Sequence, residues 1–228
     1  MPHLLPTAHR ITALHDSLLA DPRWPNADTA AREPVVGSLP LPHDGDVWPW
    51  IHANHRFNSR LWAEEDLARR TRVSDAEIAA NKRAIDGFNQ ARNDATERVD
   101  ELLLVALGLV DEASAGSDAP QSRVPPAARL NSETAGSMID RLSIMALKLH
   151  AMRAQTLRGD VDAAHVAASR IKLGRLQQQR ADLADCLDGL LADAQAGRAY
   201  FKVYRQFKMY NDSRYNPALV AERMADPQ

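Results

Sequence analysis

The sequence predicts an all-α fold, an antiparallel helical bundle of four to five main helices with an irregular N-terminal segment rich in proline and tryptophan. Apolar residues recur at the 3.6-residue helical spacing through most of the chain, and the sequence lacks segments that alternate strictly between apolar and polar residues. Helix-capping residues precede the periodic segments, and polar loops separate them. Helices joined by short polar loops favour antiparallel neighbours, so we expect a bundle.

Residues 1–50 are expected to form a short helix and an irregular segment packed on the body, and residues 51–228 to form the bundle domain. Prolines accumulate in residues 21–50. Because proline lacks a backbone donor and breaks helices, this stretch is predicted to be irregular. The same stretch holds Trp24, Trp48 and Trp50. The indoles favour a segment that lies across the helices, and a partly disordered arm is the alternative.

Capping residues set the expected starts of the first helices. Thr7 can cap the short N-terminal helix, and the first bundle helix is expected over residues 51–70. The second bundle helix begins with a capping box, in which Ser74 is followed by Glu77 at the third helical position. We expect it to extend to about residue 112, where a polar loop that contains proline ends it.

Polar residues and glycines set the ends of the next two helices. The third is expected to begin behind Asn131 or Ser132 and to stop near Gly159, which suits a left-handed C-terminal cap. The fourth is expected to start behind Asp160 and to run to about Gly197.

The C-terminal segment mixes aromatic residues with lysine and arginine. Tyr200, Tyr204 and Phe207 fall on one face if the segment is helical, and the Asn216-Pro217 step is expected to end that helix. The aromatic rings either complete the core or, beside the basic residues, stack on a sugar or base and hold phosphate.

A polar stripe runs beside the apolar stripe of the second bundle helix. Its residues are Lys82, Asp86, Asn89, Asn93, Glu97 and Asp100. Asparagine and aspartate are weaker helix formers than glutamate, lysine or glutamine, so solubility alone does not explain this choice. On the third helix, Asp140 and Arg141 lie at the edge of the core. The stripes form either a hydrogen-bonded seam or wet surface, or the wall of a ligand site.

These polar positions define the candidate ligand-binding residues. They are Lys82, Asp86, Asn89, Arg92, Asn93, Asp140, Arg141, Lys148, Lys208, Asn211 and Asp212. We expect the stripe of the second helix to face the edge of the third, with residues 208–212 closing one end of the space between them. A buried charge needs a partner. The candidates are Asp86, Asp94 and Glu97 for Arg141, and Lys82 and Arg92 for Asp140.

Charge and motif content argue against several classes of function. A formal net charge of -2 does not suit duplex nucleic acid, which selects a basic excess. The longest apolar run, residues 102–110, is too short for a membrane span. The single Cys186 cannot form an internal disulfide, which suits a reducing compartment, and the first residues do not show a leader pattern. We therefore expect a cytoplasmic location. Glycine-rich phosphate loops are absent from the sequence. Metal-binding spacing is not found around His52, His55, Glu65 and Asp66. We therefore expect no cofactor and no metal, and the catalytic residues stay unknown.

Several segments resemble one known family. They are Leu61-Trp62-Ala63-Glu64-Glu65-Asp66, Lys82-Arg83-Ala84-Ile85-Asp86, Asn89-Gln90-Ala91-Arg92-Asn93-Asp94, Asn131-Ser132-Glu133-Thr134, residues 140–144 with Lys148, and residues 208–212 with Asn216-Pro217. In this order and with similar gaps, they resemble the bacterial helical family called domain of unknown function 4254. The resemblance implies a mainly α-helical protein that is often encoded near glycosyltransferases of envelope polysaccharide or lipopolysaccharide. It implies no established activity and no catalytic residue.

Two functions follow as expectations. The first is an enzyme or accessory factor of bacterial cell-surface polysaccharide or lipopolysaccharide assembly that binds a sugar nucleotide or a glycosyl phosphate. Its cations would hold phosphate and its carboxamides would bind hydroxyls. The second is a non-catalytic helical adaptor that docks on a glycosyltransferase. A solvent-filled cleft between the polar stripes favours the first function, and a dry, fully paired seam favours the second.

Overall fold

The computed structural model describes residues 5–26, 46–206, 209 and 212–225. Within these residues the chain forms six helices and two strands of two residues each. The elements are α1 (Ala8–Ala20), α2 (Trp48–Leu67), α3 (Asp75–Ala106), β1 (Arg129–Leu130), α4 (Ala135–Thr156), α5 (Ala163–Gln195), β2 (Ala199–Tyr200) and α6 (Pro217–Ala225). The predominance of helix confirms the predicted all-α class.

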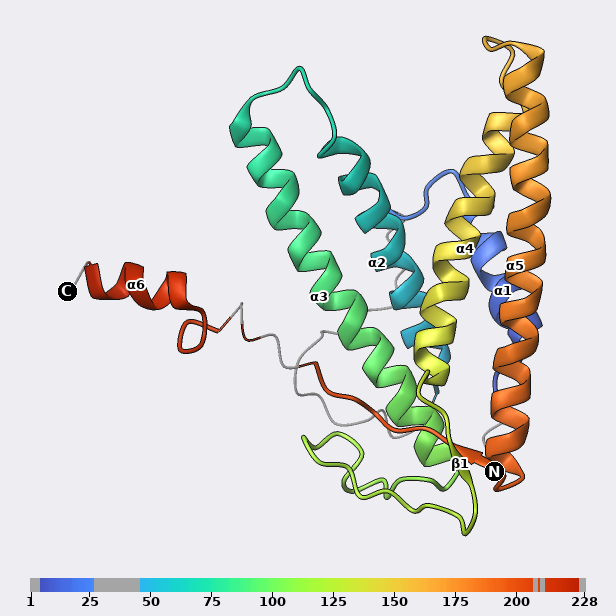
Figure 1. The fold of residues 1–228 in the computed structure, drawn as a ribbon, viewed down its shortest axis with the longest axis vertical. Coiled ribbons are helices and arrows are strands. Elements are labelled where there is room, and N and C mark those ends of the chain that lie inside the picture. Colours follow the sequence, from blue (N-terminus) through green and yellow to red (C-terminus); the bar gives the residue numbers. More distant parts are fainter. Residues whose placement is uncertain (1–4, 27–45, 207–208, 210–211, 226–228) are drawn as a thin grey trace.

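The long helices form two hairpins that meet at one base (Figure 1). α2 and α3 form one antiparallel hairpin, α4 and α5 form the other, and the two hairpins diverge toward their connecting turns. At the base, α4 contacts α1, α2 and α3, and α1 also packs against α2 and α5. The architecture is therefore an antiparallel helical bundle, as predicted, with α1 as a further member.

The hydrophobic core lies in the base, where α1 to α5 come together. Each of these helices contributes an apolar side chain that is at most 1% exposed; they include Ile11, Ile51, Leu103, Leu142 and Leu187. Buried apolar surface stabilises a fold by about 25 cal/mol per Å², so the base supplies most of the hydrophobic stabilisation. At the α4–α5 turn, by contrast, Leu157 is 84% exposed.

The predicted N-terminal caps of α1 and α3 are confirmed, but α3 is shorter than predicted. The Thr7 side chain accepts a backbone N–H of the first turn of α1, and Ser74 and Glu77 make both hydrogen bonds of the capping box. α3 ends at Ala106 and not near residue 112. The chain turns there because Gly108 adopts a φ of 68°, a left-handed conformation that glycine permits.

α4 and α5 begin later than predicted, because a different side chain caps each helix. Thr134 caps α4 in place of Asn131 or Ser132, by accepting the N–H of the third helical residue. Asp162 caps α5 in place of Asp160, also by accepting a backbone N–H of the first turn. Both caps follow the ordinary preference for threonine and aspartate at this position.

A left-handed glycine follows α5 but not α4. Gly197, the expected end of the fourth bundle helix, lies just after α5 and has a φ of 69°. The left-handed cap predicted at Gly159 is wrong, because α4 ends at Thr156 and Gly159 does not have a positive φ.

The helix predicted for the C-terminal segment is wrong at its start. Residues 199–206 contain no helix, and β2 pairs in parallel with β1 through Arg129 N–H to Arg198 O (2.9 Å) and Asn131 N–H to Tyr200 O (2.8 Å). Ala199 and Phe201, two residues apart, are both buried, which is the spacing of an extended chain. Phe207 lies outside the described residues.

Asn216 and Pro217 also differ from prediction. They begin a helix, α6, and do not end one: the Asn216 side chain accepts the N–H of Ala218 at 2.9 Å. Proline suits the first helical position, where its missing N–H has no intrahelical partner.

The described parts of the tryptophan-rich segment pack on the bundle. Trp24 stacks on His55 with ring centroids 5.4 Å apart, and its indole N–H donates to Ser59 Oγ at 2.9 Å. Trp48 and Trp50 belong to the first turn of α2, and Trp50 is buried. Residues 27–45 lie outside the described part of the chain, so the expectation for them stays a prediction.

α3 and α4 approach each other closely at Gly136. A Cβ at this position would lie 2.6 Å from the carbonyl oxygen of Thr96 and 2.8 Å from Oδ1 of Asp100. The Gly136 N–H donates to the same Asp100 oxygen at 2.6 Å. Asp100 therefore lies at the N-terminus of α4, where free N–H groups favour a carboxylate. Burial nevertheless raises the pKa of Asp100 to about 7, although hydrogen bonds from Thr134 and Gly136 act in the opposite direction.

Gly136→Ala is expected to destabilise the fold by about 1–3 kcal/mol, because the added methyl group meets a backbone carbonyl and a buried carboxyl group. Gly189→Ala is the matched control, since a Cβ there meets no atom within 4 Å and alanine favours helix by about 1 kcal/mol. Urea denaturation of both variants measures the difference. Equal effects in the two variants would contradict a steric requirement at Gly136.

Asp100→Asn is expected to change how stability depends on pH. The pKa of Asp100 is about 7 in the folded chain and 3.8 as the reference value, so the folded state binds more protons between these values. The contribution of Asp100 to stability is therefore lost as pH rises through this window. We therefore compare the free energy of unfolding of Asp100→Asn with that of the wild type. The value for the variant minus the value for the wild type should rise between pH 3.8 and about 7 and stay level above pH 7. Urea denaturation at several pH values tests this, and a constant difference would contradict it.

Candidate functional site

A polar network joins α2, α3 and α4 around the carboxylate of Asp140. Asn54 Nδ2 and Asn58 Nδ2 each donate to Asp140 Oδ1 at 2.8 Å, and Arg92 Nη1 lies 3.6 Å from Asp140 Oδ2. Asn54 Nδ2 is also 3.1 Å from Thr96 Oγ1. Both asparagines are almost fully buried. The network therefore holds a carboxylate of α4 between two carboxamides of α2 and a guanidinium of α3.

The inner end of the network reaches a buried histidine and serine. Asn58 Nδ2 donates to Ser143 Oγ at 3.0 Å, and Ser143 Oγ lies 2.8 Å from His55 Nδ1. The ring of His55 stacks on that of His15 with centroids 4.4 Å apart. Burial lowers the pKa of His55 to about 3, and the positive charges of His52 and Arg180 act in the same direction. Burial also lowers the pKa of His15 well below its ordinary value.

The serine–histidine contact is a packing interaction. His55 and Ser143 are both 0% exposed, and neither lines the groove described next. A nucleophile has to reach its substrate, so this pair serves to position neighbouring helices and not to attack a substrate.

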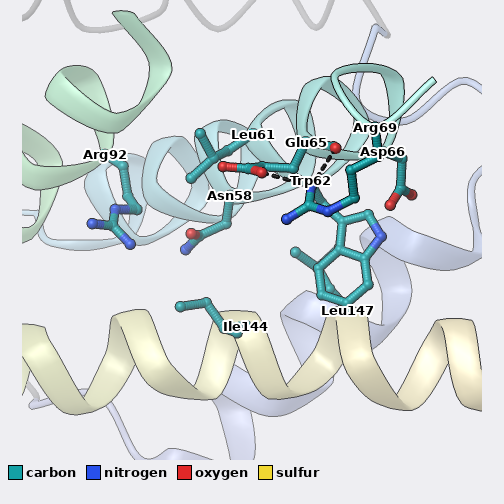
Figure 2. A pocket seen from close by; sticks show the side chains of 9 residues that line it. All are labelled: Asn58, Leu61, Trp62, Glu65, Asp66, Arg69, Arg92, Ile144 and Leu147. Carbon is teal, nitrogen blue, oxygen red and sulfur yellow. Dashed lines mark hydrogen bonds and ion pairs between the residues drawn. The ribbon is translucent and has the colours of Figure 1, made fainter. Parts of the chain in front are cut away.

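A groove of about 330 Å³ opens at the outer end of the network. It lies between α2 and α4, with one residue from α3 at its end (Figure 2). The lining residues are Asn58, Leu61, Trp62, Glu65, Asp66, Arg69, Arg92, Ile144 and Leu147. Such a volume is at the lower end of the range for small-molecule sites, about 300–1,000 Å³.

Arg92 supplies hydrogen-bond donors at the polar end of the groove. Its one hydrogen bond to the described residues runs from Nη2 to Asn93 Oδ1 at 2.9 Å, and its Nε has no partner among them. A guanidinium carries five N–H donors. Because Nε is buried, the donors that can reach the groove are the N–H groups of Nη1 and Nη2 that Asn93 and Asp140 leave unused. Asn58 lies beside it in Figure 2, and Oδ1 of Asn58 accepts no hydrogen bond from the described residues.

The rest of the groove combines an aromatic wall with a charged rim. Trp62 lies near Leu147 in Figure 2, and Ile144 lines the side formed by α4. At the rim, Arg69 Nη1 lies 2.7 Å from Glu65 Oε2, and Asp66 is exposed. The arrangement offers donors for an anion at one end, an indole face, and carboxylate acceptors at the rim.

Three of the predicted site residues come together in the structure. Arg92, Asn93 and Asp140 are linked through Arg92 by the contacts above. The pairing of Asp140 with Arg92 is one that the sequence predicted. Lys82 and Asp86 instead form an exposed pair 2.5 Å apart on the outer half of α3, and Asn89 is partly buried on the same helix.

Other predicted residues lie away from the network. Arg141 is exposed and pairs with Glu133 at 2.5 Å, so the predicted partners Asp86, Asp94 and Glu97 are wrong. The spacing of eight residues places Glu133 just before the N-terminus of α4, within reach of the Arg141 side chain. Lys148 is exposed on α4.

The C-terminal segment does not close the groove with the residues that the structure describes. Arg205 binds it to α3, with Nη1 3.1 Å from Glu97 Oε2 and 2.5 Å from Glu101 Oε1. Asp212 pairs with Arg214 at 2.7 Å, and α6 contacts none of the other described helices and strands. Lys208 and Asn211 lie outside the described residues.

Sequence reasoning missed Asn54, Asn58, Ser143 and Trp62. Two asparagines four residues apart in a helix are a detectable signal, because they share a face and asparagine is a poor helix former. The polar stripe of α3 carries the same signal.

Among the described residues, no group of three histidine, cysteine, aspartate or glutamate side chains is placed to hold a metal ion. Within the same residues, none of the helices combines the length and the apolar character that crossing a membrane requires.

The comparison with known proteins identifies a family. A family model described as "Protein of unknown function (DUF4254)" matches residues 48–203, which include α2 to α5 and the whole polar network. No curated protein and no solved structure gives a significant match. Since the matched segment covers more than half of the chain, the protein belongs to the DUF4254 family of proteins of unknown function.

Proposed function

We propose that the groove binds a phosphorylated sugar, either a glycosyl phosphate or the sugar-phosphate part of a sugar nucleotide. The protein would act as an enzyme or accessory factor in the assembly of bacterial cell-surface polysaccharide or lipopolysaccharide. The observation that carries this proposal is a single groove lined both by the guanidinium of Arg92, which keeps unused N–H donors, and by the indole of Trp62.

Arg92 is suited to hold a phosphate group. Its position is fixed by Asn93 on its own helix and by Asp140 across the network. A guanidinium so fixed can donate to a phosphate through its remaining Nη N–H groups, and it loses little side-chain entropy when it binds. Phosphate contacts of this kind are charge-assisted and about twice as strong as neutral hydrogen bonds.

The remaining lining suits a sugar ring. The flat face of the Trp62 indole can pack against the C–H face of a pyranose, while Glu65 and Asp66 can accept hydrogen bonds from hydroxyl groups. Oδ1 of Asn58 offers a further acceptor. The volume of about 330 Å³ fits a monosaccharide phosphate more closely than a whole sugar nucleotide, whose nucleoside would extend beyond the groove.

The proposed role in surface-glycan assembly rests on the family. The resemblance described above implies proteins often encoded near glycosyltransferases of envelope polysaccharide, which use phosphorylated sugars. A groove for a sugar phosphate is consistent with that setting. The adaptor function is the alternative, and it requires no small-molecule ligand.

Glucose-1-phosphate is expected to raise the thermal stability of the wild type, because a ligand that binds only the folded state stabilises it by about 2.7 kcal/mol at one hundred times its Kd. Arg92→Gln should weaken binding of the phosphorylated sugar by about tenfold or more, or about 1.4 kcal/mol. Trp62→Ala should reduce the advantage of the sugar phosphate over inorganic phosphate. Thermal shift and titration calorimetry measure these effects.

Arg83→Gln is the matched control, since Arg83 is an exposed arginine of α3 that does not line the groove. It should bind like the wild type. Screening other hexose phosphates and UDP-linked sugars covers the choice of sugar. If no phosphorylated sugar stabilises the wild type, or if Arg83→Gln weakens binding as much as Arg92→Gln, the proposal is wrong. Either result would favour the adaptor function.

A further inference from the structure

We propose a second oxyanion site in a pocket between α1, α4 and α5. The pocket has a volume of about 230 Å³ and is lined by Thr12 of α1, Leu149 and Arg153 of α4, and residues of α5 that include Gln177, Arg180 and Ala184. It would take a small phosphate monoester or carboxylate. This proposal does not depend on the function proposed above.

Arg180 is held in this pocket as part of the fold. It is 9% exposed, and its Nη1 lies 3.0 and 2.9 Å from the two carboxylate oxygens of Asp16. Its Nη2 donates to the carbonyl oxygen of Thr12 at 2.9 Å, and its Nε has no partner among the described residues. Asp16 therefore neutralises the Arg180 guanidinium and fixes its position. Because Nε is buried, the donors left for a ligand in the pocket are the remaining Nη N–H groups of Arg180.

Arg153 brings a second positive charge to the same pocket. It is exposed at the rim, and none of the described carboxylates pairs with it. The described lining contains no aspartate or glutamate. Two guanidinium groups with one carboxylate leave one positive charge in excess, and an oxyanion would offset it.

The uncharged lining sets the kind of anion. Gln177 can donate from its amide, and Leu149 and Ala184 form an apolar side. A bound anion with a small apolar body uses both features, whereas a bare, strongly hydrated ion uses only the first. The volume limits the ligand to a few heavy atoms beyond the anionic group.

The pocket is separate from the groove at Arg92. Ile144 and Leu147 of α4 line the groove, while Leu149 and Arg153 line the pocket. At 100° per residue, these two pairs point to opposite sides of α4. The two sites can therefore be tested independently with variants of different residues.

Titration of the whole protein with inorganic phosphate, and separately with acetate, tests the proposal. Arg92→Gln serves as the background so that the groove does not contribute. We expect a saturable shift of the Arg153 side-chain Nε–H resonance in a ¹H–¹⁵N spectrum with at least one of the two anions. The anion that binds more tightly identifies the class, phosphate or carboxylate.

Arg153→Gln should weaken this binding by about tenfold, read from the Nε–H resonance of Arg180. Arg170→Gln is the control, because Arg170 is an exposed arginine of α5 outside the pocket. It should leave the affinity unchanged. A linear, unsaturated response to both anions, or equal weakening in the two variants, would overturn the proposal. A loss of binding in the Arg92→Gln background relative to the wild type would also overturn it.

Discussion

The carboxylate of Asp140 constrains the three helices that meet around it. A carboxylate withdrawn from water is costly unless donors surround it. α2 supplies Asn54 and Asn58, which lie one turn apart on the same face and donate to the same oxygen, and α3 supplies Arg92 beside the other oxygen. Sliding α2 or α3 by one turn along α4 would separate these donors from Asp140. This one group therefore fixes the register of the three helices.

The close approach at Gly136 supports the same arrangement one turn away along α4. The carbonyl oxygen of Thr96 faces Gly136, and the Thr96 hydroxyl lies 3.1 Å from the Asn54 amide that also binds Asp140. The backbone contact and the polar network thus share a side chain. A larger residue at position 136 would push α3 away from α4 and lengthen the contact between Arg92 and Asp140. The geometry of the groove therefore requires glycine at this position.

Local patterns predicted the helices, whereas pairings between remote segments escaped prediction. Helical spacing and caps such as Ser74 are local, so the class, the bundle and the start of α3 followed from the sequence. The spacing of Tyr200, Tyr204 and Phe207 fits a helix equally well, but the observed strand at residues 199–200 depends on β1, which lies far away in sequence. The contact of Arg92 with Asp140 followed from the polar stripes. The role of Asn58 did not, because its hydrogen bonds to Asp140 and Ser143 depend on how α2 packs against α4.

The sequence left two alternatives for the polar stripes, a hydrogen-bonded seam between helices and the wall of a ligand site. In the structure, the two alternatives correspond to the inner and outer ends of the polar network around Asp140. At the inner end, His55 and Ser143 are fully buried and contact each other, and folding alone accounts for them. At the outer end, Arg92 makes one hydrogen bond and Oδ1 of Asn58 accepts none from the described residues. A donor left unpaired inside a protein costs about 1–3 kcal/mol, so a seam built only for stability would pair these groups. In the described part of the chain, unpaired nitrogens also occur at the inner end, at His15 and at Nε2 of His55, but it is the guanidinium of Arg92 that lines the groove, which favours a polar ligand there.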